Sequence, residues 1–336
     1  MDLVVALDIG HSTNKCLAVR VDSPTERTRA FFPTCVAPAV EISDAATRER
    51  ALRETVEVAG QRFFFGQTAR KQSGAKDFFG LNSDWVFDPM HDALLLGGLQ
   101  TMLSNFPERP SRLFVVLGLP AENYDTHKAE FSARAASLIT RYLGNTSTQV
   151  QVRIQSQPHG VLSNLIFMQD GNIQQTRDID NELWGILDLG HFSADYLMFD
   201  EGDMIQSAFG SADGVHKVYQ KVSQLLEAKS LPKDLRTLEQ AIRLRTVKHY
   251  GNDINVGADV DAIVVPFADS LIDETRNRFG RNIGKMNGII LAGGGADLIF
   301  DRFQKAFPNA IKPDNPQFSV AEGFTRFGLY LARNAQ

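Results

Sequence analysis

Two stretches of the chain share one hydrophobic pattern. Residues 3–9 form a short apolar run rich in branched side chains, and residues 183–187 form a second one. Such runs are typical of buried β-strands. Each run leads to an aspartate and a glycine-containing polar turn, and a second strand-like segment then begins near Lys15 and near Asp195. The pattern predicts tight hairpins, whereas a P-loop or dinucleotide-binding fold would start a helix at this point.

Strand-like and helix-like segments alternate along the rest of the chain. We expect further strands at 61–65, 112–117, 149–155, 204–208 and 287–291. We expect helices at 41–60, 91–105, 126–142, 161–168, 214–228, 234–247, 257–279, from 297 onward and at 319–333. Residues 71–89 have a loop-like composition, with several glycines and a proline. This alternation predicts an α/β fold.

The two hairpin motifs indicate an internal duplication. The turns Asp8-Ile9-Gly10 and Asp188-Leu189-Gly190 lie 180 residues apart in a chain of 336 residues. A chain of this length has room for about two domains. We therefore expect two similar α/β halves that face each other across a cleft, with Pro158-His159-Gly160 as the hinge between them.

Composition and charge exclude several functional classes. Apolar residues make up 43% of the chain and charged residues 22%, which argues against a disordered protein. The net charge of −5 argues against broad, direct nucleic-acid binding. Two cysteines, absence of an 18-residue apolar run and an N-terminus without a basic segment favour a cytoplasmic protein with no membrane contact.

The two turns have the chemistry of a phosphate site. A carboxylate at the end of a buried strand is costly unless a cation or a hydrogen bond compensates it. The glycine that follows lets backbone N–H groups approach a ligand. Together the turns would hold a phosphate chain, bring Asp8 and Asp188 near one Mg²⁺ through water, and let Lys15 act as a point charge.

A run of three glycines, Gly293-Gly294-Gly295, follows another predicted strand. Such a loop can lie flat against a nucleoside, because it has no side chains in the way. Taken singly, each of these features also has an ordinary explanation: a DxG sequence is usually only a turn, and glycine is common where a strand leads into a helix.

In this order, the motifs resemble those of the actin-like ATPases, in the superfamily that also contains sugar kinases and heat-shock chaperones. The resemblance covers nearly the whole chain. Three segments are similar to the two phosphate motifs and the adenosine motif, and two to the inter-domain connections: LDIGHSTNK (7–15), ILDLGHFSAD (186–195), IILAGGGADLI (289–299), SQPHGVL (156–162) and VAEGFTRFG (320–328). The segments GQRFFFGQTAR (60–70) and VVLGLP (115–120) look most like the plasmid-segregating ParM type.

This resemblance implies an actin-like, ribonuclease H-like duplicated fold, with two similar α/β domains around a nucleotide cleft. It implies domain I over 1–157, domain II over 158–318, and a C-terminal helix, 319–336, that returns to domain I. Asp8 and Asp188 match the metal-side aspartates, and Asp188 also orients the attacking water. The implied nucleotide-binding residues are Gly10, His11, Ser12, Thr13, Asn14, Lys15, Gly190, His191, Phe192, Ser193, Gly214, Lys217, Gly293, Gly294 and Gly295.

The sequence departs from the family pattern just past the first connection. Relatives usually carry Gln or Glu there to position the hydrolytic water, and this chain has His159. A neutral histidine can accept a hydrogen bond from water and act as a base. We therefore include His159 among the candidate catalytic residues, with Gln157 as its substitute. The alternative is that His159 is a hinge residue without a chemical role.

Two further histidines directly follow the DxG turns. His11 and His191 occupy equivalent places, which points to phosphate contact. In that case binding should strengthen as the pH falls through the mid-sixes, the ordinary range of the histidine pKa. The alternative is a pair of exposed turn histidines.

The resemblance implies a filament-forming ATPase or GTPase that uses Mg²⁺ and associates head to tail with copies of itself. An adaptor protein would link it to DNA. The 71–89 segment, with Phe78, Phe79, Trp85 and Phe87, is a candidate contact surface. Two alternatives remain open: a nucleotide-binding regulatory module that does not polymerise, and a small-molecule kinase of the same superfamily.

Overall fold

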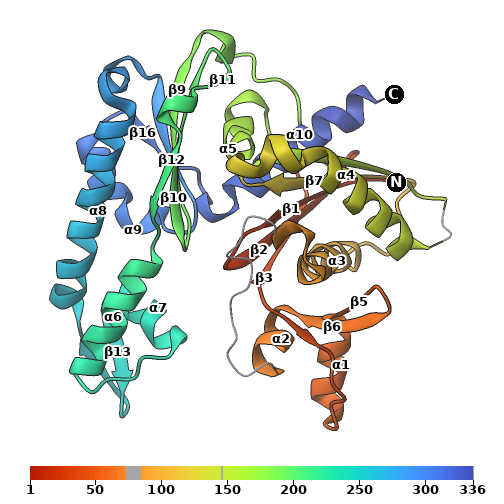
Figure 1. Cartoon of the computed structure of the whole chain (residues 1–336), viewed down its shortest axis with the longest axis horizontal. Coiled ribbons are helices and arrows are strands. Elements are labelled where there is room, and N and C mark those ends of the chain that lie inside the picture. The colour runs from red at the N-terminus through yellow and green to blue at the C-terminus, as the bar shows by residue number, and fades with distance from the viewer. Residues whose placement is uncertain (73–84, 145–146, 336) are drawn as a thin grey trace. The chain divides into compact units, whose positions relative to one another are not determined.

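The computed structural model of the chain describes residues 1–72, 85–144 and 147–335. The chain divides into two compact units, coloured along the sequence in Figure 1. Unit 1 consists of Met1–Arg177 together with Phe318–Gln336, and unit 2 consists of Asp178–Gln317. The chain therefore leaves unit 1, builds unit 2 and then returns to unit 1.

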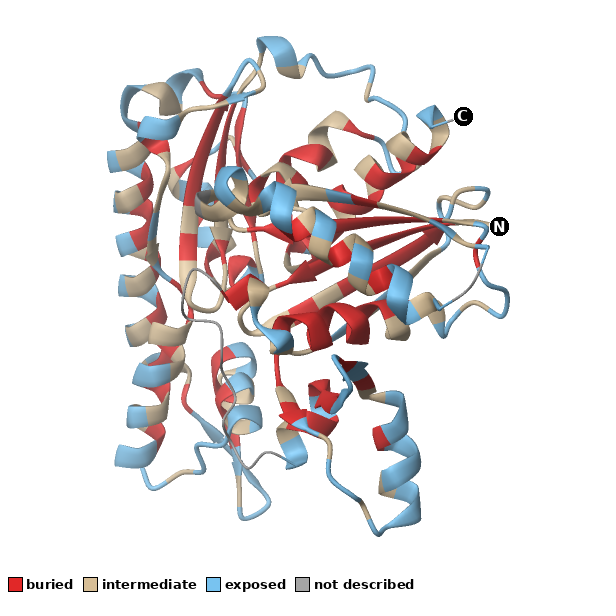
Figure 2. Cartoon of the chain, turned by 45° about the vertical axis from the view of Figure 1, so that its right-hand side comes forward, coloured by how far each residue is buried: buried red, intermediate tan, exposed pale blue. Residues whose placement is uncertain are grey.

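Unit 1 is built on a five-stranded sheet in the order β3-β2-β1-β7-β8. The strands β1, β2 and β3 pair antiparallel, whereas β7 and β8 continue the sheet parallel to β1. Their bounds are β1 Asp2–Ile9, β2 Thr13–Arg20, β3 Arg27–Pro33, β7 Arg112–Leu119 and β8 Gln149–Ser156. All of β1 after Asp2 is buried, because helices cover both faces of the sheet (Figure 2).

Alternate residues of β1 pack against different helices. Leu3, Val5 and Leu7 belong to a core that includes residues of α3 (Pro89–Leu103) and α4 (Ala121–Leu143). On the other face, Val4 packs with Leu329 and Ala332 of α10 (Ser319–Asn334). The strand thus shows the period-two alternation of side chains, with both sets buried.

Helix α10 belongs to unit 1 although it follows unit 2 in the sequence. It packs against α5 (Gln157–Ile166), where a Cβ at Gly323 would overlap the carbonyl oxygen of Gly160. Glu322 of α10 also pairs with Arg27 and Arg29 of β3. Glycine at this crossing is therefore required for the close approach of the two helices.

A smaller layer extends unit 1 beyond β3. It contains a three-stranded sheet in the order β4-β6-β5. Its elements are β4 Val36–Pro38, α1 Ala45–Arg53, β5 Thr55–Val58, β6 Gln61–Phe65, α2 Gly66–Gln72 and the 3₁₀ helix η1 Trp85–Phe87. The helix expected at 41–60 is therefore only partly correct. Residues Thr55–Val58 alternate in burial and pair with β6 because their β-branched side chains suit a half-buried strand.

Unit 2 repeats the sheet pattern of unit 1. Its central order is β11-β10-β9-β15-β16, with β12 paired to β10. The β9–β10 pair is antiparallel and β15 is parallel to β9, as β1–β2 and β7 are in unit 1. The bounds are β9 Leu183–Leu189, β10 Ser193–Asp200, β11 Asp203–Met204, β12 Gly210–Asp213, β15 Gly288–Ala292 and β16 Ala310–Ile311. The duplication expected from the sequence is present.

The remaining elements of unit 2 are mainly helical. Helices α8 and α9 pack on the central sheet, and a second core joins α6, α7, β13 and part of α8. The bounds are α6 His216–Ala228, α7 Leu235–Leu244, β13 Thr246–His249, β14 Asn252–Asn255, α8 Gly257–Phe279 and α9 Ala296–Ala306. Short 3₁₀ turns are η2 Ile179–Asn181, η3 Gln206–Ala208, η4 Gly280–Lys285 and η5 Pro316–Phe318. The strand expected at 204–208 is wrong, because most of it is η3.

The segment expected as a hinge is part of a helix. Pro158, His159 and Gly160 lie in the first turn of α5, which starts at Gln157. The compact first unit extends to Arg177, because α5 packs against α10 within it. Among the described residues, no helix has the length and apolar character needed to cross a membrane.

Candidate functional site

Asp8 is the centre of the first turn. Its side chain is buried, and both of its oxygens accept a hydrogen bond. Lys15 Nζ lies 3.0 Å from Oδ2, and Gln157 Nε2 donates to Oδ1 across 3.0 Å. Lys15 is opposite Asp8 in the β1–β2 register, while Gln157 comes from the first position of α5. These contacts compensate the cost of burying the carboxylate.

The backbone of the first turn is braced from a neighbouring strand end. The Gly10 N–H donates to the Thr13 carbonyl across 3.3 Å. Thr34, just after β3, donates its N–H to the Ser12 carbonyl across 3.0 Å and its hydroxyl to the Gly10 carbonyl. The hydroxyls of Ser12 and Thr13 lie 3.3 Å apart and are partly accessible. Local sequence gave no sign of Thr34, because the contact spans 24 residues.

Asn14 has a different place from the other predicted residues of this turn. Its side chain is fully buried and donates to the Leu94 carbonyl of α3 across 3.2 Å. Its amide oxygen accepts from the thiol of Cys16. The side chain of Asn14 therefore joins the turn to the core, and only its backbone is left for a ligand.

The second turn packs against the start of α6. The Gly190 N–H donates to the Ser193 carbonyl across 2.9 Å, which matches the bond that closes the first turn. The Gly214 N–H donates to the Phe192 carbonyl across 2.9 Å. A Cβ on Gly214 would lie 2.5 Å from the His191 carbonyl oxygen, so no larger residue fits there.

The glycine loop lies beside the carboxylate of the second turn. Gly293 has φ +86°, and a Cβ there would lie 2.5 Å from Asp188 Oδ1. A Cβ on Gly295 would lie 2.5 Å from Val215 Cγ1, at the base of α6. At Gly294 the nearest atom would be 3.7 Å away. The structure thus brings Asp188, the second turn and the glycine loop together within unit 2.

His191 is enclosed by rings, which corrects the expectation of an exposed histidine titrating in the mid-sixes. Its ring lies 5.5 Å from that of Tyr219, 4.8 Å from that of Phe192 and 6.3 Å from that of His216. Burial, and secondarily the nearby His216, lowers the pKa of His191 to about 4. His191 is therefore neutral at pH 7 and can give one N–H hydrogen bond to a phosphate oxygen.

Two other predicted residues of this unit have partners along the protein. The hydroxyl of Ser193 donates to Asp195 Oδ2 across 2.9 Å. Lys217 Nζ lies 3.8 Å from Asp213 Oδ1, and both side chains are largely exposed. Such an exposed pair contributes little to stability, so the ammonium group can exchange to an incoming phosphate.

His159 and Gln157 occupy different environments in the first turn of α5. His159 Nδ1 lies 2.5 Å from Ser156 Oγ, and burial lowers the pKa of His159. Gln157 instead contacts Asp8 directly. Of the two residues weighed for positioning water, Gln157 is the one with a contact to a predicted metal-side aspartate.

An aromatic contact to the first turn comes from a distant segment. The imidazole of His11 lies 4.8 Å from the indole of Trp85, with a 34° angle between the rings. Trp85 is buried, so this part of the expected contact surface faces the interior, and Phe87 is half-buried. The remaining aromatics of that prediction, Phe78 and Phe79, lie outside the described residues.

Among the described residues, no group of three or more His, Cys, Asp or Glu side chains could hold a metal ion. Mg²⁺ is usually bound by one or two carboxylates, water and substrate phosphates, not by an all-protein cage. The carboxylates of Asp8 and Asp188 at the two turns therefore fit an ion that arrives with a nucleotide.

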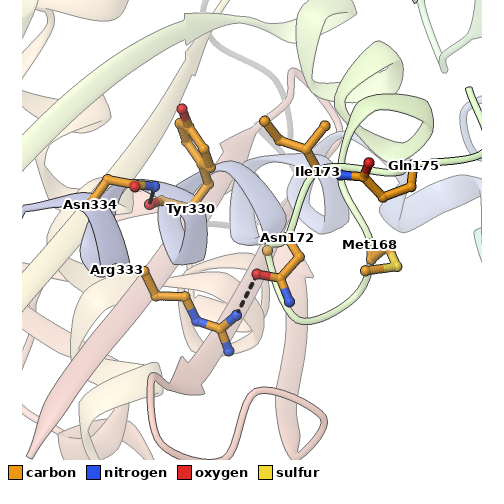
Figure 3. A pocket seen from close by; sticks show the side chains of 8 residues that line it. Met168, Asn172, Ile173, Gln175, Tyr330, Arg333 and Asn334 are labelled. Atoms are coloured by element: carbon orange, nitrogen blue, oxygen red, sulfur yellow. Dashed lines mark hydrogen bonds between the residues drawn. The ribbon is translucent and has the colours of Figure 1, made fainter. Parts of the chain in front are cut away.

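A cavity of about 490 Å³ lies elsewhere in unit 1 (Figure 3). It lies between the segment after α5 and the last turns of α10, and Arg333 donates to Asn172 across its rim. Its lining residues are Met168, Gly171, Asn172, Ile173, Gln175, Tyr330, Arg333 and Asn334. None of these is a predicted site residue, so this cavity is not the candidate site.

Each half of the chain matches a known domain family. Residues 6–160 match the family described as the N-terminal domain of actin-like proteins. Residues 186–305 match the family described as the C-terminal part of the archaeal, MreB-like actin homologue. An archaeal actin homologue of Thermoplasma volcanium is 25% identical over 233 residues, which cover 64% of this chain and 68% of that protein.

Solved structures share the fold at low sequence identity. A ParM from a 15-stranded filament of Clostridium botulinum has a TM-score of 0.70 and 17% identity, over 97% of this chain and 99% of that one. The archaeal actin homologue Ta0583 in complex with ADP has a TM-score of 0.69 and 18% identity, over 99% of this chain and 100% of that one. With the two domain matches, this fold identifies the chain as an actin-like protein of two α/β domains.

Proposed function

We propose that this actin-like protein binds ATP or GTP with Mg²⁺, hydrolyses it and assembles head to tail with copies of itself. One observation carries the proposal: each unit places an aspartate at the end of the same central strand, followed by a glycine turn closed by the same backbone bond. Two such turns are suited to one phosphate chain. The related Ta0583 has been solved with ADP, and a related ParM as a filament.

In the first turn, Lys15 has the central role. Its ammonium group lies on Asp8, within reach of the turn backbone: a Cβ on Gly10 would lie 3.0 Å from Lys15 Nζ. A phosphate bound against Gly10 would therefore meet a positive charge at once. Gln157 keeps its hydrogen bond to the other carboxylate oxygen, so Asp8 does not lose both partners when Lys15 turns to the ligand.

In the second turn, we assign Asp188 to orient the attacking water. Phosphoryl transfer depends on positioning and on neutralising charge more than on covalent chemistry. Mg²⁺, when bound, would neutralise phosphate charge, with Asp8 and Asp188 holding it through water. Gly293 leaves the space beside Asp188 Oδ1 free of side chains, and neutral His191 donates a hydrogen bond from the same turn.

Assembly would follow from nucleotide state. Head-to-tail contacts are heterologous and do not close, so a fibre results. We propose a cytomotive role of the ParM type, such as segregation of plasmid DNA through an adaptor protein. The net charge of −5 supports an adaptor over direct DNA contact.

Phosphate release and light scattering, measured together with ATP·Mg²⁺ or GTP·Mg²⁺, test the proposal. We expect scattering to rise with nucleotide and to fall as phosphate is released, with fibres visible by electron microscopy. Phosphate release without scattering would contradict assembly and indicate a monomeric ATPase. Nucleotide binding without release would indicate a regulatory module, and release that requires an added metabolite would indicate a kinase.

A further inference from the structure

The imidazole of His11 is not held by its own hairpin alone. It follows Gly10 in the first turn, and its ring meets the indole of Trp85 at a centroid distance of 4.8 Å. Trp85 begins η1, 74 residues further along the chain. A contact of this kind aligns two flat rings and restricts the rotation of the smaller, more accessible one.

The indole is itself fixed from behind. The ring of His91 meets it edge-on at 4.7 Å, and the ring of Phe131 from α4 meets His91 at 5.4 Å. Trp85, His91 and Phe131 are each less than 5% exposed. The Trp85 carbonyl also accepts from the N–H of Asp88, the N-cap residue of α3. The indole therefore has no free space in which to turn.

Nothing in the core requires a ring contact at His11. The other side chains of the turn are fixed by hydrogen bonds, as Lys15 is by Asp8 and Asn14 by Leu94. His11 is the partly accessible member of a stack whose deeper members are buried. The stack thus presents one polar ring beside Gly10, at the surface where the proposed function places phosphate.

We propose that Trp85 is a positioning residue for the first phosphate turn: its indole holds the His11 imidazole in the orientation that contacts nucleotide phosphate. This inference rests on the proposed nucleotide site. It adds a group that the DxG motif does not contain, and it makes the affinity of the turn dependent on η1.

The first test is a double-mutant cycle on nucleotide affinity in the full chain. We measure Kd for ADP·Mg²⁺ by calorimetry in wild type, His11→Ala, Trp85→Leu and the double variant. Each single change should weaken binding about tenfold, the effect of losing one hydrogen bond to a charged group. The double variant should bind no more than about twofold worse than either single variant, because Trp85 acts through His11.

Two further variants separate positioning from folding. Trp85→Phe keeps a ring and should recover most of the affinity lost in Trp85→Leu. Phe87→Leu alters the same η1 segment, where its ring faces His127 instead of the turn, and should bind as wild type does. Additive effects of Trp85 and His11, or equal losses in Phe87→Leu, would overturn the proposal.

Trp85 fluorescence gives a readout that a purely structural role would not change. In a Trp184→Phe background Trp85 is the only indole, since the chain has two tryptophans. Adding ADP·Mg²⁺ should change its emission, and the change should vanish in His11→Ala. Binding seen by calorimetry without that change would contradict the inference, whereas wild type that binds no nucleotide would contradict the proposed function itself.

Discussion

The carboxylate and imidazole groups of the two turns depend on their immediate neighbours. Asp8 is buried with a partner on each oxygen, whereas Asp188 is only partly buried and lies against the glycine loop. This difference matches the roles that we propose for the two residues. Asp8 anchors the turn and its cation, and Asp188 has the space in which water can be held.

Replacing Asp188 by Asn should lower the rate of phosphate release by about a hundredfold or more, because the amide cannot accept a proton or orient water as the carboxylate does. The fold and nucleotide binding should persist, since the two side chains have the same size. Steady-state phosphate release and calorimetry measure both effects.

Asp200→Asn is the matched control for that change. Asp200 is an exposed carboxylate at the other end of the same strand pair, so its loss should leave turnover unchanged. Turnover in Asp188→Asn equal to that of wild type would remove Asp188 from the mechanism.

His91 makes stability depend on pH. Burial, with the charges of Arg134 and His11, lowers its pKa to about 3 from the ordinary value near 6.5. Between these values the unfolded chain binds more protons than the folded chain, so stability falls as the pH falls below 6.5. From pH 7 to pH 5 His91 alone should cost about 2 kcal/mol of unfolding free energy.

Urea unfolding at several pH values checks this effect. The variant His91→Leu should show a shallower loss of stability over that interval than wild type does. The remaining loss should include a contribution from His191, whose pKa is lowered in the same direction. Equal slopes in wild type and His91→Leu would show that His91 is not the group responsible.

At the scale of single residues, the sequence predicted the chemistry of the turns better than their contacts. The Asp8–Lys15 pair could be predicted, because residues seven apart across a tight hairpin face each other. The buried side chain of Asn14 and the rings around His191 could not be predicted, since α3 and α6 provide those contacts from distant positions in the sequence.

Among the secondary-structure elements, the loop after β15 tolerates change very unevenly. Gly293→Ala should destabilise the protein by about 2 to 4 kcal/mol, because it combines a positive φ with overlap against Asp188 and Leu189. Gly294→Ala, one residue further on, should stay within about 1 kcal/mol of wild type, because the nearest atom is 3.7 Å from its Cβ. Thermal unfolding of the two variants gives the comparison, and equal melting temperatures would contradict it.

The predicted elements failed where tertiary contacts overrode the local pattern. Pro158 and Gly160 suggested a break, yet proline is accommodated in the first turn of a helix, where its missing N–H has no intrahelical partner to lose. Residues 204–208 alternate like a strand, but Ile205 bonds to Met198 and the chain then turns as η3. The duplicated hairpins survived because their patterns are long and repeated.

At the scale of the whole molecule, the two turns belong to units that differ in how the chain builds them. Unit 2 is one continuous segment, whereas unit 1 needs α10 from the far end of the sequence. Without α10, the buried face formed by Val4, Val19 and Phe114 has no cover. The sequence predicted the return of this helix only through the resemblance of its motif to the second connection.

A chain shortened to residues 1–317 should therefore lose the cooperative unfolding of unit 1, while one shortened to 1–334 should behave as the full chain does. The reason is the apolar area that Phe324, Leu329 and Ala332 bury. Hydrogen exchange of amides in β1 and β7 reports on unit 1 directly. Full protection of those amides in the 1–317 chain would contradict the prediction.

The return of α10 also sets an order of events during protein synthesis. Domains usually fold as they leave the ribosome, the first part of the chain before the next. Here the first 177 residues must wait with one face of their sheet uncovered until residues 318–334 have emerged, whereas the segment between them can fold as soon as it is complete. The part of the protein made first is therefore the part finished last, and in the interval its exposed apolar strands are a natural target for chaperones.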